Sequence, residues 1–315
     1  MHKPYSIAMN KTLFSNNYFT ILVLILFSFS VISCDDFDSD QTNPSFVYVK
    51  GFKLIENPNI TQSSIDGFQT EAITDAWVYV DNEYIGTYVL PCNIPILKEG
   101  NHKIDIRPGI KLNGIALTRT EYPFYTYYSE TQSLVAGNTI TIDTIDIMYV
   151  EQYTIFALSE LFERPYLAFT TDGVGQDTNK LVKCNNQDTV KWGDYCGAMY
   201  LNSDQSSYRI ISDSIFCNNY SSLILEIDYW CNIPFEIGIS GKPSSAAATQ
   251  YISAMVLNSN DTKGWQKVYV VLGKVWSQLS YTNDFRIYFT PQKKDGITNG
   301  WVFIDNVKII HKPNN

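Results

Sequence analysis

Hydrophobic and polar positions alternate with a period of two along most of the chain after residue 45, and turn-forming residues interrupt this alternation at short intervals. The pattern predicts half-buried β-strands, because an amphipathic helix would repeat its apolar positions at helical spacing instead. The nearest approach to a helical period, around 155–162, is short. The pattern therefore predicts an all-β protein.

The predicted strands form two groups that separate near residue 150. The first group comprises 46–55, 76–80, 84–89, 103–107 and 139–147. The second comprises 166–170, 197–201, 208–212, 222–230, 235–240, 251–257, 265–272, 285–290 and 301–310. Short strands in series are typical of sandwiches and jelly rolls. We therefore predict two β-sandwiches in series, over 45–150 and 151–313.

The first 33 residues break this pattern. Lys3 and Lys11 are the only charged side chains before Cys34, and an apolar run occupies 18–33. A basic start followed by a short apolar run is typical of a secretory signal, and the run is short of the ~20 residues that a membrane-spanning helix needs. The alternative interpretation is a membrane anchor.

The end of the apolar run favours the signal peptide. Val31-Ile32-Ser33-Cys34 resembles the lipobox of bacterial lipoproteins. That resemblance implies that 1–33 is removed and that Cys34 is acylated, which attaches the protein to a membrane. Residues 34–44 are then a flexible acidic tether.

The tether contains a cluster of acids, Asp35, Asp36, Asp38 and Asp40. Such a cluster resembles the export signal of Gram-negative bacteria that display lipoproteins outward. An Asp directly after the cysteine also resembles the inner-membrane retention signal of enterobacteria. We expect an outer-membrane lipoprotein facing the cell surface, with retention as the alternative.

Composition narrows the class of partner. The 315 residues include 23 basic and 32 acidic side chains, for a net charge of −9. An acidic balance argues against a nucleic-acid partner, which needs a basic surface. The 22 tyrosines within a 14% aromatic content fit β-structure.

Cysteines and histidines offer little catalytic chemistry. After Cys34 the cysteines are Cys92, Cys184, Cys196, Cys217 and Cys231. Cys184 and Cys196 could close a loop, whereas Cys217 and Cys231 flank a predicted strand and should not pair. The mature chain keeps only His102 and His311, so a His-based triad or metal site is unsupported.

The segment 76–109 carries a first family resemblance. Its strand, Asp81-Asn82 turn, second strand, proline and Leu97-Lys-Glu-Gly-Asn-His-Lys-Ile run resemble the PEGA-type module of bacterial envelope proteins. The resemblance implies a small immunoglobulin-like sandwich that acts as a spacer or adhesive scaffold. It also places His102 on a structural histidine of that module.

The C-terminal half carries a second resemblance. The segments 264–272 and 300–309 are similar to strands of galactose-binding-type jelly rolls, a family that includes many carbohydrate-binding modules. Strand alternation places a mixed polar and aromatic set on the outer faces. Since sugars need aromatic faces and planar polar groups, the candidate ligand residues are Glu226, Asp228, Trp230, Tyr269, Arg286 and Tyr288. An ordinary solvated face or a protein contact is the alternative.

The resemblance also makes Asp305 a candidate ligand of a structural Ca²⁺, with partners in the loop that contains Asp172-Gly173 and Asp177. A capping or turn-bonding role is the alternative for Asp305. No other cofactor is implied.

Together these features predict a non-enzymatic, lipid-anchored surface protein that binds glycan through its C-terminal jelly roll. The alternative is a structural or adhesive accessory lipoprotein that recognises a protein of an envelope complex. A carboxylate-type glycoside hydrolase is the third interpretation.

Overall fold

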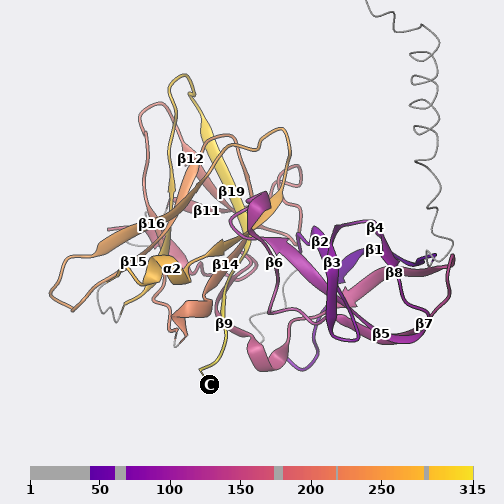
Figure 1. The fold of residues 1–315 in the computed structure, drawn as a ribbon. Coiled ribbons are helices and arrows are strands. Elements are labelled where there is room, and N and C mark those ends of the chain that lie inside the picture. The colour runs from indigo at the N-terminus through magenta and orange to yellow at the C-terminus, as the bar shows by residue number, and fades with distance from the viewer. Residues whose placement is uncertain (1–42, 61–68, 174–179, 218, 280–283, 315) are drawn as a thin grey trace, which may run out of the picture. The chain divides into compact units, whose positions relative to one another are not determined.

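The computed structural model describes residues 43–60, 69–173, 180–217, 219–279 and 284–314 (Figure 1). The predicted signal peptide, Cys34 and nearly all of the predicted tether lie outside these ranges. The chain from Pro44 to Asn315 forms one unit. Strands dominate this unit, so the all-β prediction is confirmed. Among the described residues, no helix has the length and apolarity that crossing a membrane would need.

The N-terminal sandwich has two sheets, of strand order β4-β1-β8 and β3-β2-β5-β6, with β7 paired to β5. Side chains from both sheets form one core around Val47, Val78 and Ile106. The strands are β1 (Ser45–Leu54), β2 (Asp75–Val80), β3 (Glu83–Val89), β4 (Cys92–Ile96), β5 (Gly100–Lys111), β6 (Arg119–Glu121), β7 (Tyr128–Leu134) and β8 (Thr139–Ile147). Five of these match predicted strands, and β4, β6 and β7 were not predicted.

The predicted Asp81-Asn82 hairpin is confirmed. Val80 and Glu83 are register partners, and the φ angles of Asp81 and Asn82 are 52° and 67°. A two-residue type I′ turn needs positive φ at both central positions, which Asp and Asn tolerate better than most residues. His102 fixes this turn, because its Nδ1 lies 2.7 Å from Asp81 Oδ2.

The C-terminal sandwich has two antiparallel sheets. We call β10-β13-β18-β15-β16 the front sheet and β11-β12-β19-β14-β17, with β9 paired to β19, the back sheet. The strands are β9 (Ile155–Glu160), β10 (Phe169–Thr171), β11 (Leu181–Cys184), β12 (Cys196–Leu201), β13 (Ile210–Ser212), β14 (Ile224–Cys231), β15 (Phe235–Gly241), β16 (Gln250–Leu257), β17 (Gln266–Val271), β18 (Arg286–Pro291) and β19 (Gly300–His311).

The described helices are one turn long. They are the 3-10 turns η1 (Ala116–Thr118), η2 (Glu151–Tyr153) and η4 (Tyr220–Ser222), and the helix α2 (Gly273–Trp276). The segment with the closest approach to a helical pattern is instead strand β9, because Leu158 pairs with Ile309 of β19 and its alternate side chains face the core.

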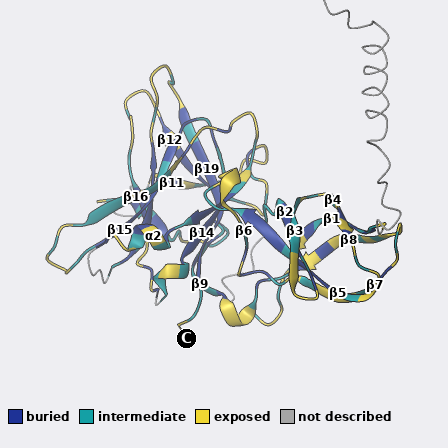
Figure 2. Cartoon of the chain, in the orientation of Figure 1, coloured by how far each residue is buried: buried dark blue, intermediate teal, exposed yellow. Residues whose placement is uncertain are grey.

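A bulge in β19 decides which side chains meet the N-terminal sandwich. Between Glu226 and Asp228 of β14 the register shifts, so that Glu226 opposes Lys308 while Asp228 opposes Asp305. Asn306, inside the bulge, has a φ of 47°. The extra residue places Asp305 and Lys308 on the same outer face of the back sheet. Figure 2 colours most of β19 as buried, which fits its position at the centre of this sheet.

The two sandwiches share part of one core. Ile224, Tyr269 and Ile310 of the back sheet pack into the hydrophobic cluster of the N-terminal sandwich. Asn113 joins the two backbones, since its N–H donates to Tyr269 O at 2.7 Å and its Oδ1 accepts from Val271 N at 3.0 Å. The outer face of the back sheet is therefore partly an internal surface.

Candidate functional site

The structure does not bring the six predicted ligand residues together. Glu226, Asp228, Trp230 and Tyr269 lie on strands of the back sheet, whereas Arg286 and Tyr288 lie on β18 of the front sheet. Alternation in the sequence predicted which side chains of these strands point inward and which point outward. It could not predict which of the two sheets each strand joins. The two outer faces therefore have to be considered separately.

The expectation that Glu226, Asp228 and Tyr269 are exposed is wrong. They are 0%, 1% and 1% exposed. Two tyrosines of the N-terminal sandwich cover this face and donate hydrogen bonds to the Glu226 carboxylate, Tyr122 at 2.5 Å and Tyr149 at 2.9 Å. These carboxylates hold two parts of the chain together and are closed to a large ligand.

A buried lysine compensates the charge of this face. Lys267 Nζ lies 3.1 Å from Glu226 Oε2 and 3.9 Å from Asp228 Oδ2, and Thr70 donates to Asp228 at 2.6 Å. Burial lowers the pKa of Lys267, but the two carboxylates outweigh it and raise that pKa overall. Buried charges persist only when they are paired in this way.

Asp305 and Lys308 lie on the same covered face with fewer partners. Burial raises the pKa of Asp305 to about 8, and burial together with the charge of Lys267 lowers the pKa of Lys308 to about 8. Among the described residues, Asp305 Oδ2 and Lys308 Nζ have no hydrogen-bond partner. Both groups are therefore biased toward their neutral forms.

These surroundings do not fit the predicted calcium site. Asp172 lies beyond the end of β10 in the front sheet while Asp305 lies in the back sheet, and Asp177 lies outside the described residues. Calcium also needs six to eight oxygen ligands. No group of three or more His, Cys, Asp or Glu side chains within the described ranges could hold a metal ion.

Trp230 lies on the part of the back sheet beyond these charges. Its ring centroid is 5.1 Å from that of Trp301 and 6.0 Å from that of Phe303, and its Nε1 donates to Asp261 O at 3.0 Å. Tyr200 continues this aromatic cluster and is 50% exposed. Trp230 is thus a partly buried member of an edge-to-face cluster.

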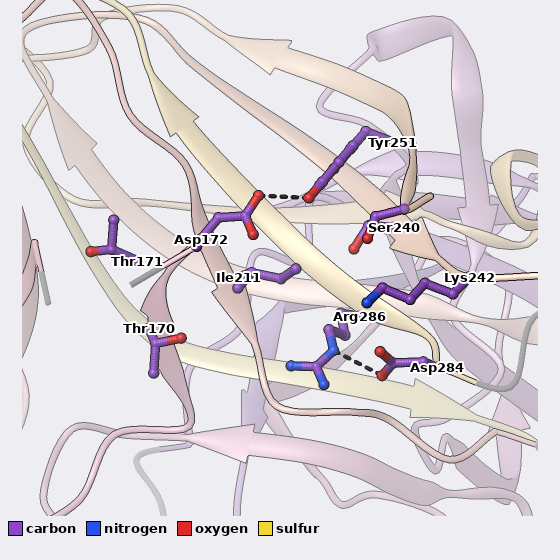
Figure 3. Close-up of a pocket in the computed structure, with 11 residues that line it drawn as sticks. Thr170, Thr171, Asp172, Ile211, Ser240, Lys242, Tyr251, Asp284 and Arg286 are labelled. Atoms are coloured by element: carbon purple, nitrogen blue, oxygen red, sulfur yellow. Dashed lines mark hydrogen bonds and ion pairs between the residues drawn. The ribbon is translucent and has the colours of Figure 1, made fainter. Parts of the chain in front are cut away.

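The front sheet carries an open pocket of about 420 Å³ on its outer face. Figure 3 shows side chains from several strands and from two loop ends around it. The lining includes Thr170, Thr171, Asp172, Ile211, Ser240, Lys242, Tyr251, Asp284 and Arg286. The predicted ligand residue Arg286 thus lines a concave surface.

Strand register builds the centre of this pocket. Ser240 of β15 is the register partner of both Tyr251 on β16 and Arg286 on β18. Directly opposed residues in antiparallel strands point to the same face. A tyrosine, a hydroxyl and a guanidinium therefore lie in one row across three strands.

Acid–base pairs hold the polar groups at both ends of this row. Arg286 Nε donates to Asp284 Oδ1 at 2.8 Å (dashed in Figure 3), and its Nη1 donates to Ser212 O at 3.1 Å. At the other end, the Tyr251 hydroxyl donates to Asp172 Oδ2 at 2.6 Å. Burial and this hydrogen bond raise the pKa of Tyr251, so that the hydroxyl keeps its proton.

Tyr288, the other predicted residue of this sheet, lies beneath the surface and is 2% exposed. Its ring crosses β15 at Gly238, where a Cβ atom would lie 2.2 Å from the ring, so only glycine fits. Arg209 lies above it, 3.9 Å from the Tyr251 ring centroid and 5.0 Å from that of Tyr288. Tyr288 therefore supports the site from below.

A lysine and a buried hydroxyl complete the pocket. The charge of Lys242 helps to lower the pKa of Asp284, so this ammonium lies near that carboxyl. Ser240 Oγ is buried and has no hydrogen-bond partner among the described residues. A buried hydroxyl without a partner costs about 1–3 kcal/mol, which a ligand atom can recover.

Sequence reasoning missed most of this pocket. Tyr251 and Ser240 lie inside predicted strands. Asp284 lies two residues before Arg286, so alternation places Asp284 and Arg286 on the same face. The missing information was the strand order, because β18 lies beside β15 in the sheet although β16 and β17 separate the two in sequence.

Comparison with known proteins finds similar solved structures only at low sequence identity and low TM-score. No family model matches the chain, and no curated protein matches it. Among solved structures, a carbohydrate-binding module of the β-sandwich superfamily, from a study of promiscuous specificity, is 13% identical. The match covers 78% of this chain and 86% of that one, with a TM-score of 0.35.

Two structures that contain CBM22 modules are also similar. One holds the CBM22-1–GH10 modules of Clostridium thermocellum endo-1,4-β-D-xylanase 10B complexed with xylohexaose, and is 14% identical. This match covers 51% of this chain and 29% of that chain, with a TM-score of 0.38. The CBM22-2 xylan-binding domain of Paenibacillus barcinonensis Xyn10C is 14% identical over 49% of this chain and 99% of its own, at a TM-score of 0.36.

Proposed function

We propose that the C-terminal sandwich binds a glycan chain in the pocket on the outer face of the front sheet. The observation that carries this proposal is the row Tyr251, Ser240 and Arg286. In it, a buried hydroxyl that has no partner among the described residues lies between a tyrosine and a guanidinium. A ligand rich in hydroxyl groups can supply the partner that Ser240 lacks.

The groups around this row suit sugar hydroxyls. Two hydrogen-bonded pairs present donors and acceptors to the pocket, and the bond within each pair fixes the orientation of both side chains. The pairs are Asp284–Arg286 and Tyr251–Asp172. Planar guanidinium and carboxylate groups bind vicinal hydroxyls in two-point contacts. The ring of Tyr251, held against Arg209, offers an apolar surface to the C–H face of a pyranose.

Binding without hydrolysis fits the electrostatics better than catalysis. Glycoside hydrolysis needs a carboxylic acid with a raised pKa beside an ionised carboxylate. Burial raises the pKa of Asp284, but hydrogen bonds from Arg286 and Ser214 outweigh burial and lower it overall. Asp284 therefore favours its ionised form, which accepts hydrogen bonds and is a poor proton donor.

The attachment of the protein is a separate part of the proposal. The lipobox-like Val31-Ile32-Ser33-Cys34 supports acylation at Cys34 and surface display through the acidic tether. Mass spectrometry of membrane-extracted protein should find Cys34 as an acylated N-terminal residue. Recovery of an unprocessed N-terminus, or of a processed N-terminal Cys34 without acyl chains, would contradict this part alone.

Affinity electrophoresis tests the glycan-binding part. The whole protein should be retarded in native gels that contain a soluble polysaccharide that it binds. The polysaccharides tested include a β-1,4-xylan and a β-1,4-galactan. A glycan array extends the test to other sugars. Failure to bind any polysaccharide, together with capture of one envelope protein by cross-linking in intact cells, would favour the accessory role instead.

A further inference from the structure

Two of the five cysteines that the structure describes, all of them free thiols, lie opposite each other on neighbouring strands. In the antiparallel pair β11–β12, Cys184 is the direct register partner of Cys196. Opposed residues in such a pair have Cα atoms about 4.5–5.5 Å apart and share a face. A disulfide needs a Cα separation of about 4.4–6.8 Å, so this register satisfies the requirement without backbone movement.

The two thiols also touch. The side chains of Cys184 and Cys196 are within hydrogen-bonding contact of each other. The other three described cysteines are far apart. Cys217 precedes η4 whereas Cys231 ends β14, and Cys92 belongs to the N-terminal sandwich. The fold therefore selects one pair among the described cysteines.

We propose that Cys184 and Cys196 form a cross-strand disulfide when the protein meets an oxidant of the disulfide class, either a small molecule such as oxidised glutathione or a dithiol oxidoreductase. Cys184 is half-buried and reacts first, because Cys196 is 0% exposed. The Cys184 thiolate attacks one sulfur of the oxidant, which leaves a mixed disulfide and releases one thiol.

The Cys196 sulfur then attacks Cys184 Sγ and completes the cross-link. The second half of the oxidant departs as a thiolate and takes the proton of Cys196. Two protein thiols are thereby oxidised to one disulfide, and one oxidant disulfide is reduced to two thiols. Burial raises the pKa of Cys196, so this thiol is unreactive until Cys184 holds the mixed disulfide beside it.

The cross-link would fix the edge of the back sheet. Strand β11 is the outer strand of its sheet and spans only Leu181–Cys184. Its preceding residue, Lys180, donates its N–H to Thr171 Oγ1 at 2.6 Å, and Thr171 lines the pocket of the front sheet. Fixing β11 therefore also restrains one rim of the candidate site.

Peptide mapping tests the proposal directly. The folded full-length protein is treated with oxidised glutathione, its free thiols are blocked with iodoacetamide, and the chain is digested with trypsin. Cleavage after Lys183, Lys191 and Arg209 places the two cysteines on separate peptides, 184–191 and 192–209. We expect these peptides to run as one linked species that dithiothreitol separates.

Two variants make the result specific. Cys196→Ser should stop at the mixed disulfide, so that peptide 184–191 carries one glutathione. Cys217→Ser should leave the cross-link intact, because that thiol lies elsewhere. Unchanged circular dichroism checks that the treated parent protein is folded. If peptides 184–191 and 192–209 are then recovered separately, each alkylated or each carrying glutathione, the proposal is overturned.

Discussion

The front and back sheets of the C-terminal sandwich both carry carboxylates, cations and tyrosines on their outer faces. On the back sheet, the N-terminal sandwich covers these groups, and Lys267 is paired with Glu226 inside a closed interface. On the front sheet, Arg286 and Asp284 pair beside an open pocket. Residue type alone does not mark a binding site, because the same chemistry stabilises an interface where it is covered and can receive a ligand where it is open.

Removal of the buried lysine should give the largest effect. Lys267→Met leaves Glu226 and Asp228 as buried charges without compensation, which costs about 3–5 kcal/mol. Urea unfolding measures the loss. The matched control is Lys50→Met. Lys50 Nζ lies 3.1 Å from Asp143, and the two side chains are 60% and 75% exposed, so this change should lower the unfolding free energy by less than about 1 kcal/mol. Equal losses in the two variants would contradict a closed interface.

Loss of one interface hydroxyl should have the next largest effect. Tyr122→Phe removes the buried hydrogen bond to the Glu226 carboxylate, which is also paired with Lys267, and should lower the unfolding free energy by about 1.5–3 kcal/mol. Tyr251→Phe is the counterpart on the open face, where water can replace the hydroxyl as the partner of Asp172, and should change stability by less than about 1 kcal/mol. The reverse order would mean that the roles of the two faces are exchanged.

Stability should depend on pH through Asp305. Its pKa is about 8 in the folded protein against an ordinary value of 3.8, so between these pH values the folded state keeps a proton that the unfolded chain loses. Stability then falls as pH rises, by up to about 1.4 kcal/mol per pH unit. Lys308 titrates between about 8 and 10.5 and leaves the lower window unaffected.

Asp305→Asn should remove this slope. Unfolding free energies of parent and variant, measured at pH 5, 6 and 7, should diverge in favour of the variant as pH rises. Parallel curves would show that Asp305 is ionised in the folded protein.

Changes in the open pocket should have the smallest effect on folding. Arg286→Ala removes a guanidinium that is one-third exposed, and should change the unfolding free energy by less than about 1 kcal/mol. Thermal unfolding of parent and variant checks this. A large loss of stability would assign Arg286 to the support of the fold.

Local patterns predicted local structure well. The Asp81-Asn82 turn and the whole of β8, Thr139–Ile147, follow from turn chemistry and alternation. Alternation also placed Glu226 and Asp228 on the outer face of β14. It could not show that the N-terminal sandwich covers that face, because this depends on contacts between residues about a hundred positions apart, such as Tyr122 and Glu226.

The candidate pocket was less predictable for the same reason. Arg286 was identified because it stands outward between two inward side chains. Asp172, Ser240 and Tyr251 join it only through the order of β10, β15, β16 and β18 in the front sheet. A strand order that differs from the chain order leaves no signal in the periodicity of a single sequence.

The most direct test of the central claim is calorimetric titration of a polysaccharide that retards the parent protein into three proteins: the parent, Arg286→Ala and Tyr200→Ala. Arg286 lines the front-sheet pocket, while Tyr200 is an exposed aromatic side chain on β12 of the back sheet. We predict that Arg286→Ala weakens binding by about tenfold or more, as expected when a charged hydrogen-bond partner is lost, and that Tyr200→Ala binds like the parent. Unchanged affinity in Arg286→Ala, with loss of binding in Tyr200→Ala, would contradict the claim and place the site on the back sheet.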